Sequence, residues 1–200
     1  MPKISSYTTT APALTDKLIG TDANDNSATK NFTVGDVLSL RNPNDFNLVL
    51  ESSSPIADSP QTATAINTPT KILLGDAVSG TGVSLAINGD LTFSTEGKYY
   101  VQLLVNSGSV SASSVASVYS IYFNSYKNDT VYGSAIQDSL YLINNQTSTT
   151  EGLSINIIFD AAVADVLSFK FSVSNLIMGL KHQASTLGNV RSANIKIYKI

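Results

Sequence analysis

The sequence predicts an all-β protein, built as a sandwich or jelly roll, from its composition and from the pattern of its apolar residues. Only 14% of the 200 residues are charged, where about 25% is usual for soluble domains. Much of the polarity comes from 47 Ser and Thr residues and nine Tyr, which suit a pleated surface better than a helix. Apolar and polar residues also alternate in short runs over the last 130 residues, as in half-buried strands.

We expect about eight or nine strands at spacings of about 8–20 residues, as in sandwiches and jelly rolls. The run at 83–87 alternates cleanly, and Asn88-Gly89 after it supplies a hairpin turn. The other expected strands lie at 91–93, 99–105, 115–124, 140–143, 153–159, 169–173 and 195–197. The alternating faces predict one buried and one outward side for most of them.

The chain is expected to have three parts. Residues 71–200 form the jelly-roll knob, and residues 46–70 form an extended Ser/Pro/Thr linker with the first strand, because the prolines there restrict pairing to a sheet edge. In residues 1–45 we expect short strands at 17–20 and 31–34 and a helix of about two turns at 35–41, which is too short to be stable alone. This first part therefore needs a surface to dock onto, as an attachment segment does.

Composition excludes several classes of site. The chain has no cysteine, which excludes disulfides, thiolate catalysis and zinc–cysteine centres, and it has a single histidine, His182. A net charge of −3 argues against nucleic-acid binding. No apolar run approaches the length of a membrane span, and the first ten residues lack the apolar stretch of a signal peptide. We expect no enzymatic activity, no metal, no cofactor, no nucleic-acid partner and no membrane insertion.

Asp22, Asn24 and Asn26 have the spacing that opens a calcium-binding loop. The sixth and twelfth positions of that pattern should be Gly and Glu, but here they are Ser27 and Thr33. Without the bidentate carboxylate, the segment is expected to be an Asx-rich turn.

The remaining groups that enzymes use are also expected to be structural. His182 is expected on the surface, and no Gly-x-Ser-x-Gly motif accompanies it. The pairs Asp160 with Asp165 and Asp129 with Asp138 flank predicted turns. Glycosidase chemistry needs two facing carboxylates, and we expect these four to be solvated surface charges instead.

Tyrosines are the most informative group, because they lie on or beside the central strands. Tyr100 and Tyr122 fall on the face opposite the apolar stripe of their strands. Aromatic residues with few charges are typical of subunit interfaces, so we expect self-association. The expected interface residues are Tyr100, Tyr119, Tyr122, Tyr126 and Tyr141. Core packing and a carbohydrate-binding platform are the alternative roles for these rings.

The segment FSTEGKYYV at 93–101 resembles the Phe-x-x-x-Gly-x-Tyr-x-Val signature of the C1q/TNF-like jelly roll. Residues 151–155 sit where that family has a Gly-Asp-x-Val strand, although the Asp is absent here. Residues 59–69 and 193–200 are similar to the first and last strands of phage versions of the domain. The resemblance covers residues 55–200 and implies a ten-stranded sandwich that assembles as a homotrimer.

The N-terminal segments ALTDKLIGTD at 13–22 and TKNFTVGDV at 29–37 resemble the virion-attachment segment of bacteriophage fibre and appendage proteins. A single attachment segment joined to one knob is most similar to the short trimeric head fibres of crAss-like phages. This resemblance implies a structural virion protein on the capsid surface, made in the cytoplasm of the bacterial host.

The resemblance implies a capsid or auxiliary capsid protein as the partner of the N-terminal segment. The anchoring residues would be Leu14, Leu18, Ile19, Phe32, Val34, Val37 and Leu38. The alternative is a tail or receptor-binding fibre tip that grips host cell-surface glycan with loops at 106–113 or 144–151. A polysaccharide-degrading enzyme is the least supported alternative, because no acids converge in the sequence.

Overall fold

The computed structural model describes residues 15, 17–22, 28–34, 47–54, 60–112, 116–142, 150–185 and 188–200. The chain divides into two compact units, residues 1–45 and 46–200. The helix expected at 35–41 and three expected anchor residues, Leu14, Val37 and Leu38, lie outside the described residues. Within them, no helix has both the length and the apolar character needed to cross a bilayer.

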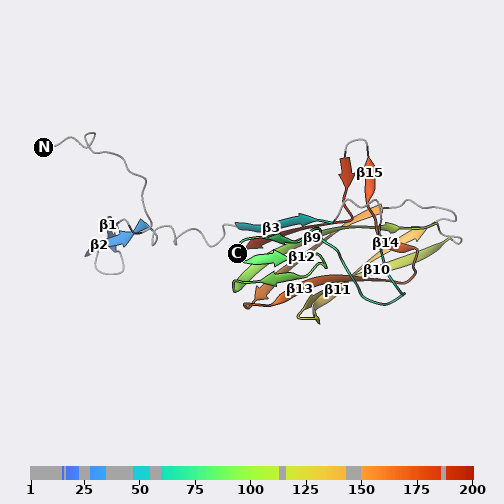
Figure 1. The fold of residues 1–200 in the computed structure, drawn as a ribbon, viewed down its shortest axis with the longest axis horizontal. Coiled ribbons are helices and arrows are strands. Elements are labelled where there is room, and N and C mark those ends of the chain that lie inside the picture. The colour runs from blue at the N-terminus through green and yellow to red at the C-terminus, as the bar shows by residue number, and fades with distance from the viewer. Residues whose placement is uncertain are drawn as a thin grey trace. The chain divides into compact units, whose positions relative to one another are not determined.

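The smaller unit contains one antiparallel hairpin, coloured blue in Figure 1. It consists of β1 (Lys17–Asp22) and β2 (Ala28–Thr33). Lys17 lies opposite Thr33, and Asp22 lies opposite Ala28. These strands cover most of the two short strands expected at 17–20 and 31–34.

The larger unit is a sandwich of two antiparallel sheets, which we name after their strands β9 and β10 (Figure 1). The β9 sheet contains, in spatial order, β3 (Asn47–Ser53), β17 (Ala193–Lys199), β9 (Gly97–Ser109) and β12 (Thr150–Ala161), and the short strands β14 (Met178–Leu180) and β4 (Gln61–Thr62) pair beside the last residues of β9. The β10 sheet contains β11 (Thr130–Leu142), β10 (Ser117–Lys127), β13 (Val166–Val173), β8 (Leu91–Phe93), β7 (Val83–Leu85) and β6 (Val78–Ser79), with β5 (Thr70–Lys71) paired to β13. A separate hairpin of β15 (Gln183–Ser185) and β16 (Gly188–Val190) projects from the sandwich (Figure 1).

The connectivity of the sandwich is that of a jelly roll. In chain order, the strands that form the two main sheets are β3, β8, β9, β10, β11, β12, β13 and β17. The β9 sheet takes the first, eighth, third and sixth of them, and the β10 sheet takes the second, seventh, fourth and fifth. Each sheet therefore receives strands from both halves of the chain, as the paired Greek keys of a jelly roll require. The predicted all-β jelly-roll sandwich is confirmed.

The two ends of the sandwich unit lie side by side. Asn47 at the start of β3 is opposite Lys199 at the end of β17, and Lys199 is opposite Tyr99 at the start of β9. The stretch expected as a linker with the first strand thus contributes β3 to the sheet itself. β9 ends and β12 begins at the opposite end of the unit, where Gly108 lies opposite Thr150.

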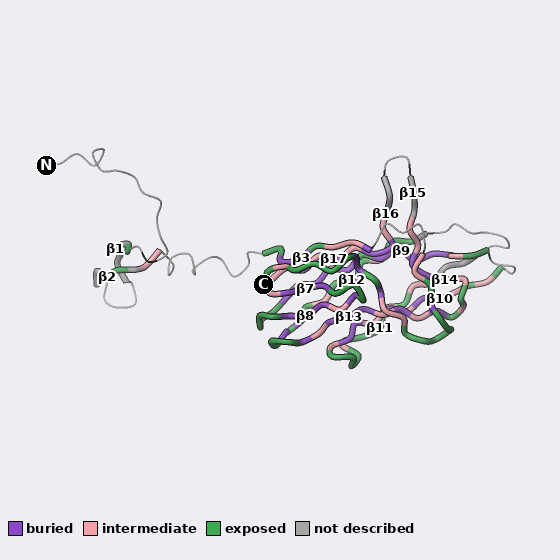
Figure 2. The backbone as a smooth tube through the Cα atoms, viewed as in Figure 1, coloured by how far each residue is buried: buried purple, intermediate pink, exposed green. Residues whose placement is uncertain are grey.

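The core lies between the sheets and follows from the alternation of the strands (Figure 2). Phe93, Tyr99 and Phe159 are fully buried, and the Phe93 ring centre lies 4.7 Å from that of Tyr99 and 4.9 Å from that of Phe159. The Tyr99 hydroxyl donates to the carbonyl oxygen of Thr95 at 2.8 Å, and burial raises the pKa of this phenol. Gly97 adopts a φ of +141°, which L side chains rarely reach. The Phe-x-x-x-Gly-x-Tyr pattern therefore encodes one aromatic cluster and the turn that builds it.

One strand is much longer than expected. The predicted strand at 140–143 overlaps only the last part of β11, which begins at Thr130 directly after a turn where Asn128 and Asp129 have positive φ. β11 is the edge of its sheet, and most of its described side chains are exposed. An edge strand that faces solvent lacks the apolar stripe by which buried strands are found, which explains the difference.

Candidate interaction surfaces

The β1–β2 hairpin and the residue after it hold the four expected anchor residues that lie within the described part of the chain. Leu18 and Ile19 lie in β1, and Phe32 lies in β2 directly opposite Leu18. Val34 follows β2 and is half-buried. An isolated two-stranded hairpin is at best marginally stable in water. This hairpin therefore carries apolar residues in its sequence and is too small to be stable alone.

A row of apolar and aromatic residues crosses the outer face of the β9 sheet. Leu48 is opposite Tyr198, Tyr198 is opposite Tyr100, and Tyr100 is opposite Ile158. Their chain neighbours Ile197, Tyr99 and Phe159 are fully buried in the core, so the row faces outward. Leu48 is 50% exposed and Ile158 is 61% exposed. We call these four residues the aromatic row.

The tyrosines at the centre of the aromatic row are partly fixed. Their ring centres are 6.1 Å apart, within the range of favourable aromatic pairs. The Tyr100 hydroxyl donates to Asn156 Oδ1 at 2.9 Å. Two adjoining half-exposed rings with a bonded hydroxyl present a pre-ordered contact surface, so little rotamer freedom remains to be lost on binding.

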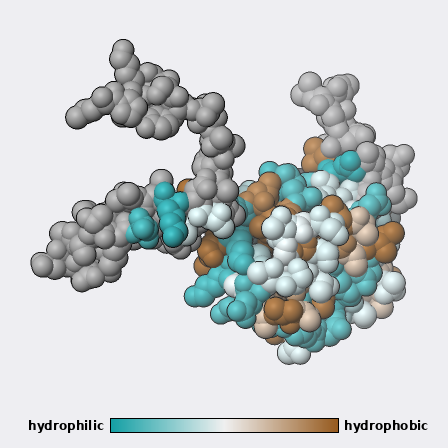
Figure 3. Space-filling view, turned by 60° about the vertical axis from the view of Figure 1, so that its left-hand side comes forward, coloured by the Kyte–Doolittle hydropathy of each residue, from teal (hydrophilic) through white to brown (hydrophobic). Residues whose placement is uncertain are grey.

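The row beside it on the same face is polar, and its charges are paired. Lys196 is opposite both Glu51 and Gln102, and Gln102 is opposite Asn156. Lys196 Nζ lies 3.1 Å from Glu51 Oε1, and this hydrogen bond raises the pKa of the lysine amine. Figure 3 shows hydrophobic patches set among hydrophilic residues on the face that it draws. The β9 sheet thus combines apolar contact area with locally neutralised charge.

The five expected interface tyrosines do not share one surface. Tyr100 lies on the outer face of the β9 sheet, whereas Tyr122 alternates with the core residues of β10 and faces out of the other sheet. Tyr126 is only 8% exposed, with Lys170 Nζ 4.1 Å from its ring centre. Tyr119 is partly buried against the core. Tyr141 is in β11 opposite Val118, and its side chain lies outside what the structure describes.

The other three members of the aromatic row were missed by sequence reasoning. Leu48 lies in the stretch expected as a linker with the first strand, and Ile158 is an apolar residue at a position that the alternation of the expected strand 153–159 assigns to the outward side. Tyr198 follows the alternation of Ile195 and Ile197, so the closing strand did carry a signal for an outward aromatic residue.

Asp165 ties two turns of the sandwich together. Its carboxylate accepts hydrogen bonds from Asn128 Nδ2 at 2.8 Å and from the Ala162 amide at 2.7 Å, and it lies 2.7 Å from Lys127 Nζ. The Lys127 hydrogen bond, with those from Ala162 and Asn128, lowers the pKa of Asp165 to about 2. Asn128 Oδ1 in turn accepts from the Val166 amide at 2.8 Å. Through these hydrogen bonds, this buried acid links the β10–β11 turn to the β12–β13 turn.

Asp160 is exposed, as expected, whereas the two remaining acids have side-chain partners. Asp129 pairs with Lys170 at 3.2 Å, and Asp138 accepts from Ser107 Oγ at 2.6 Å. His182 is half-buried, and its Nε2 atom is buried without a hydrogen-bond partner. In the described ranges, no group of three or more acidic or histidine side chains is placed to hold a metal ion. Residues 23–27 of the Asx-rich segment lie outside those ranges.

Comparison with known proteins gives a distant structural likeness. No family model matches the chain, and no curated protein matches it. Among solved structures, the chain is similar to the globular domain of zebrafish complement 1qA protein, with 13% sequence identity and a TM-score of 0.42 over 77% of this chain and 97% of that domain. The strand order of the two sheets defines the jelly roll independently of this likeness.

Proposed function

We propose that the chain is a structural protein of a bacteriophage virion, a homotrimeric head fibre or decoration that attaches to the capsid through residues 1–45. The observation that carries the proposal is the division of the chain into a two-stranded unit with apolar positions and a jelly-roll sandwich with its own core. The resemblance of residues 13–37 to phage attachment segments supplies the virion context. The knob displayed beyond the attachment segment carries no enzymatic role in this proposal.

The hairpin unit supports an anchoring role. Its expected anchor residues gain roughly 1.5–3 kcal/mol for each large apolar side chain that a partner fully buries. Three linked copies raise the effective concentration of each anchor after the first has bound. A small segment can thus hold a trimer firmly on a capsid or auxiliary capsid protein.

The distribution of tyrosines supports the trimer. A ring of three identical chains closes through heterologous contacts, in which each copy contributes two different patches. Tyr100 on the β9 sheet and Tyr122 on the β10 sheet supply aromatic residues to two different faces. The exposed apolar members of the aromatic row, Leu48 and Ile158, are the part of the β9 sheet that such a contact would cover.

Deletion of residues 1–40 tests the attachment. The shortened protein should remain a soluble trimer and should no longer join phage particles, and continued incorporation would refute the anchor. Mass measurement of residues 46–200, a unit with its own core, tests the assembly separately. A monomer that persists at high concentration would refute the trimer.

The second candidate function is a receptor-binding fibre tip that adheres to host cell-surface glycan. Two observations favour it. The Tyr100 and Tyr198 rings adjoin the amide side chains of Gln102 and Asn156, a combination that suits sugar stacking and hydrogen bonding. β9 also ends, and β12 begins, at the end of the sandwich opposite Asn47, and the loops expected to grip glycan, 106–113 and 144–151, include these strand ends. Specific binding of the purified knob to host cells would favour this function over the head-fibre role.

A further inference from the structure

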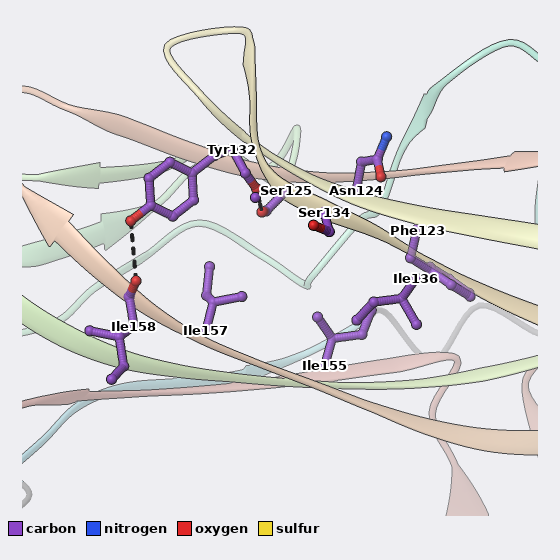
Figure 4. A pocket seen from close by; sticks show the side chains of 10 residues that line it. Phe123, Asn124, Ser125, Tyr132, Ser134, Ile136, Ile155, Ile157 and Ile158 are labelled. Atoms are coloured by element: carbon purple, nitrogen blue, oxygen red, sulfur yellow. Dashed lines mark hydrogen bonds between the residues drawn. The ribbon is translucent and has the colours of Figure 1, made fainter.

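The sandwich has a cavity at each of its two edges, and the cavity between β11 and β12 is apolar (Figure 4). A bulge shapes this edge, because three residues of β11 lie opposite one residue of β10. Figure 4 shows Ile136 and Ile155 close together at one side of the cavity, with Tyr132 and Ile158 at the other. The Tyr132 hydroxyl donates to the Ile158 carbonyl at 3.2 Å, and no charged side chain lines the cavity. This edge shares Ile158 with the aromatic row.

The opposite edge, between β3 and β6, holds a polar cavity of about 620 Å³. Residues 51–54, at the end of β3, form one wall together with Arg191, and residues 75–78, which lead into β6, form the other. The lining includes three serines, two acids and one arginine. A volume of this size is within the range of small-molecule sites. Donors and acceptors of hydrogen bonds therefore surround the same space.

Hydrogen bonds fix the wall that carries the arginine. Ser54 is buried directly after β3, and its backbone amide donates to the Ala193 carbonyl at 2.8 Å. Its hydroxyl accepts from the Ala193 amide at 3.1 Å and from Ser192 Oγ at 2.9 Å. Arg191 Nη1 donates to the Ser54 carbonyl at 3.0 Å. This is the only hydrogen bond of the guanidinium to the residues that the structure describes, so four of its five N–H donors remain available.

A glycine sets the position of the opposite wall. Gly75 adopts a φ of +121°, and a Cβ atom there would meet the Ser53 carbonyl oxygen and would lie 2.7 Å from Ser52 Oγ. This wall therefore passes as close to β3 as glycine alone permits. The next residue, Asp76, is exposed. Within the described ranges, the Asp76 carboxylate and the hydroxyls of Ser52 and Ser53 make no hydrogen bond, so they are available to a ligand.

The charges of the lining are balanced. Glu51 is paired with Lys196 at 3.1 Å, which leaves the carboxylate of Asp76 and the guanidinium of Arg191. An anion would be repelled by Asp76 and a cation by Arg191, and either would lose hydration on entry. An uncharged molecule with several hydroxyl groups avoids these costs, because a hydroxyl both donates to a carboxylate and accepts from a guanidinium. The cavity therefore favours a neutral sugar ring.

We propose that the cavity between β3 and β6 binds a neutral saccharide, whose hydroxyls donate to Asp76 and accept from Arg191. The hydroxyls of Ser52 and Ser53 would complete the contact. This proposal rests on the second function proposed above, adhesion to glycan, and places the bound sugar at this edge rather than on the aromatic row. The head-fibre role does not depend on it.

The test uses the full chain and the methyl glycosides of glucose, galactose, mannose and N-acetylglucosamine as probes. Saturation-transfer NMR should detect binding of at least one of them. Asp76→Asn removes the charged acceptor and should weaken that binding at least tenfold. Glu96→Gln neutralises another exposed acid, outside the cavity, and should leave the binding unchanged. Equal binding by the two variants, or tighter binding of the anion methyl glucuronide than of the neutral probes, would overturn the proposal.

Two further variants locate the site. Ala77→Trp places a large ring at an exposed position of the lining and should abolish binding, while Ala162→Trp, at an exposed position of the β12–β13 turn, should preserve it. Binding that is lost in Tyr100→Ala and kept in Ala77→Trp would overturn the cavity as the site and would leave the glycan function standing on the aromatic row. Absence of binding of every probe would overturn the proposal, and the adhesion of the purified knob to host cells then decides the glycan function separately.

Discussion

Tyr100 lies directly opposite Tyr198 on neighbouring strands of the β9 sheet, and both rings face outward. Leu48 and Ile158 extend this pair into a row across four strands. Most of the outward positions beside the row are polar, and the charges of Lys196 and Glu51 are paired there. Burial of this row in a contact with another molecule would therefore contribute more free energy than burial of the polar positions beside it.

Ile158→Asp should weaken self-association of the full chain at least tenfold, about 1.4 kcal/mol, because it places a charge on the most exposed apolar residue of the surface to be covered. Val163→Asp is the matched control. Val163 is 62% exposed against 61% for Ile158, but it lies in the β12–β13 turn. Sedimentation velocity over a concentration series measures both variants. The same association constant for the two variants would contradict a contact through the aromatic row.

Lowering the pH should destabilise the sandwich through Asp165. The pKa of this carboxyl is about 2 in the folded protein against an ordinary 3.8. The charged form is therefore favoured by folding, and its contribution is fully present above about pH 4 and is lost as the pH falls toward 2. The pKa difference corresponds to about 2 kcal/mol of unfolding free energy. Urea denaturation at a series of pH values between 5 and 2 measures it.

Asp165→Asn provides the control for this pH dependence. The variant should be less stable at pH 7 by about 1.5–3 kcal/mol, since it loses charge-assisted bonds from Lys127 and from a backbone amide. Its stability should also fall less steeply between pH 4 and 2 than that of the unmodified chain. An unchanged pH profile in the variant would assign the acid sensitivity to other carboxyls.

Gly97→Ala should destabilise the larger unit by about 1–3 kcal/mol, because a φ of +141° is strained for any residue with a side chain. The added Cβ would also meet Lys199 Cε at 3.0 Å, which that flexible side chain can relieve. Gly152→Ala is the control, since Gly152 does not have a positive φ and its nearest neighbour would be Asn106 Oδ1 at 3.4 Å. Chemical denaturation should show a loss for Gly97→Ala alone. Comparable losses would mean that backbone conformation is not the cause.

The double substitution of Leu18→Asp and Phe32→Asp should prevent incorporation into phage particles, because it places two charges at opposite positions of the hairpin. Thermal unfolding of the 46–200 unit should not change, since that unit has its own core. Asn31→Asp alters an exposed residue of the same strand and should leave incorporation intact. Full incorporation of the double variant would contradict a role for the hairpin in attachment.

The sequence was sufficient to predict the sandwich because most of its strands bury one face, and burial leaves an alternating pattern. The core residues Val101, Leu103 and Phe171 stand at the positions that alternation assigns to the inside. β11 was predicted only at its end, since an exposed edge strand has no such pattern. The bulge of β11 was not predictable, because the opposition of residues 133–135 to the single residue Asn124 of β10 is a property of strand register rather than of residue type.

The tyrosines show the same limit at the candidate site. Alternation correctly placed Tyr100 and Tyr122 on the outer sides of their strands, but only the topology shows that they belong to different sheets. The row partners Leu48, Tyr198 and Ile158 come from three further strands, two of them near the ends of the unit's sequence. Their association depends on which strands become neighbours, and the order of strands in a sheet cannot be read from a single sequence.

The pairing of Asn47 with Lys199 has a practical consequence for engineering this protein. A short peptide that joins Ile200 to residue 46 would link neighbouring strands, so the knob is suited to circular permutation with new termini in a distant loop. An affinity tag or fluorescent label added after Ile200 would emerge beside the start of β3. A peptide or protein that is meant to project away from that side should instead be inserted after β9 or after β11.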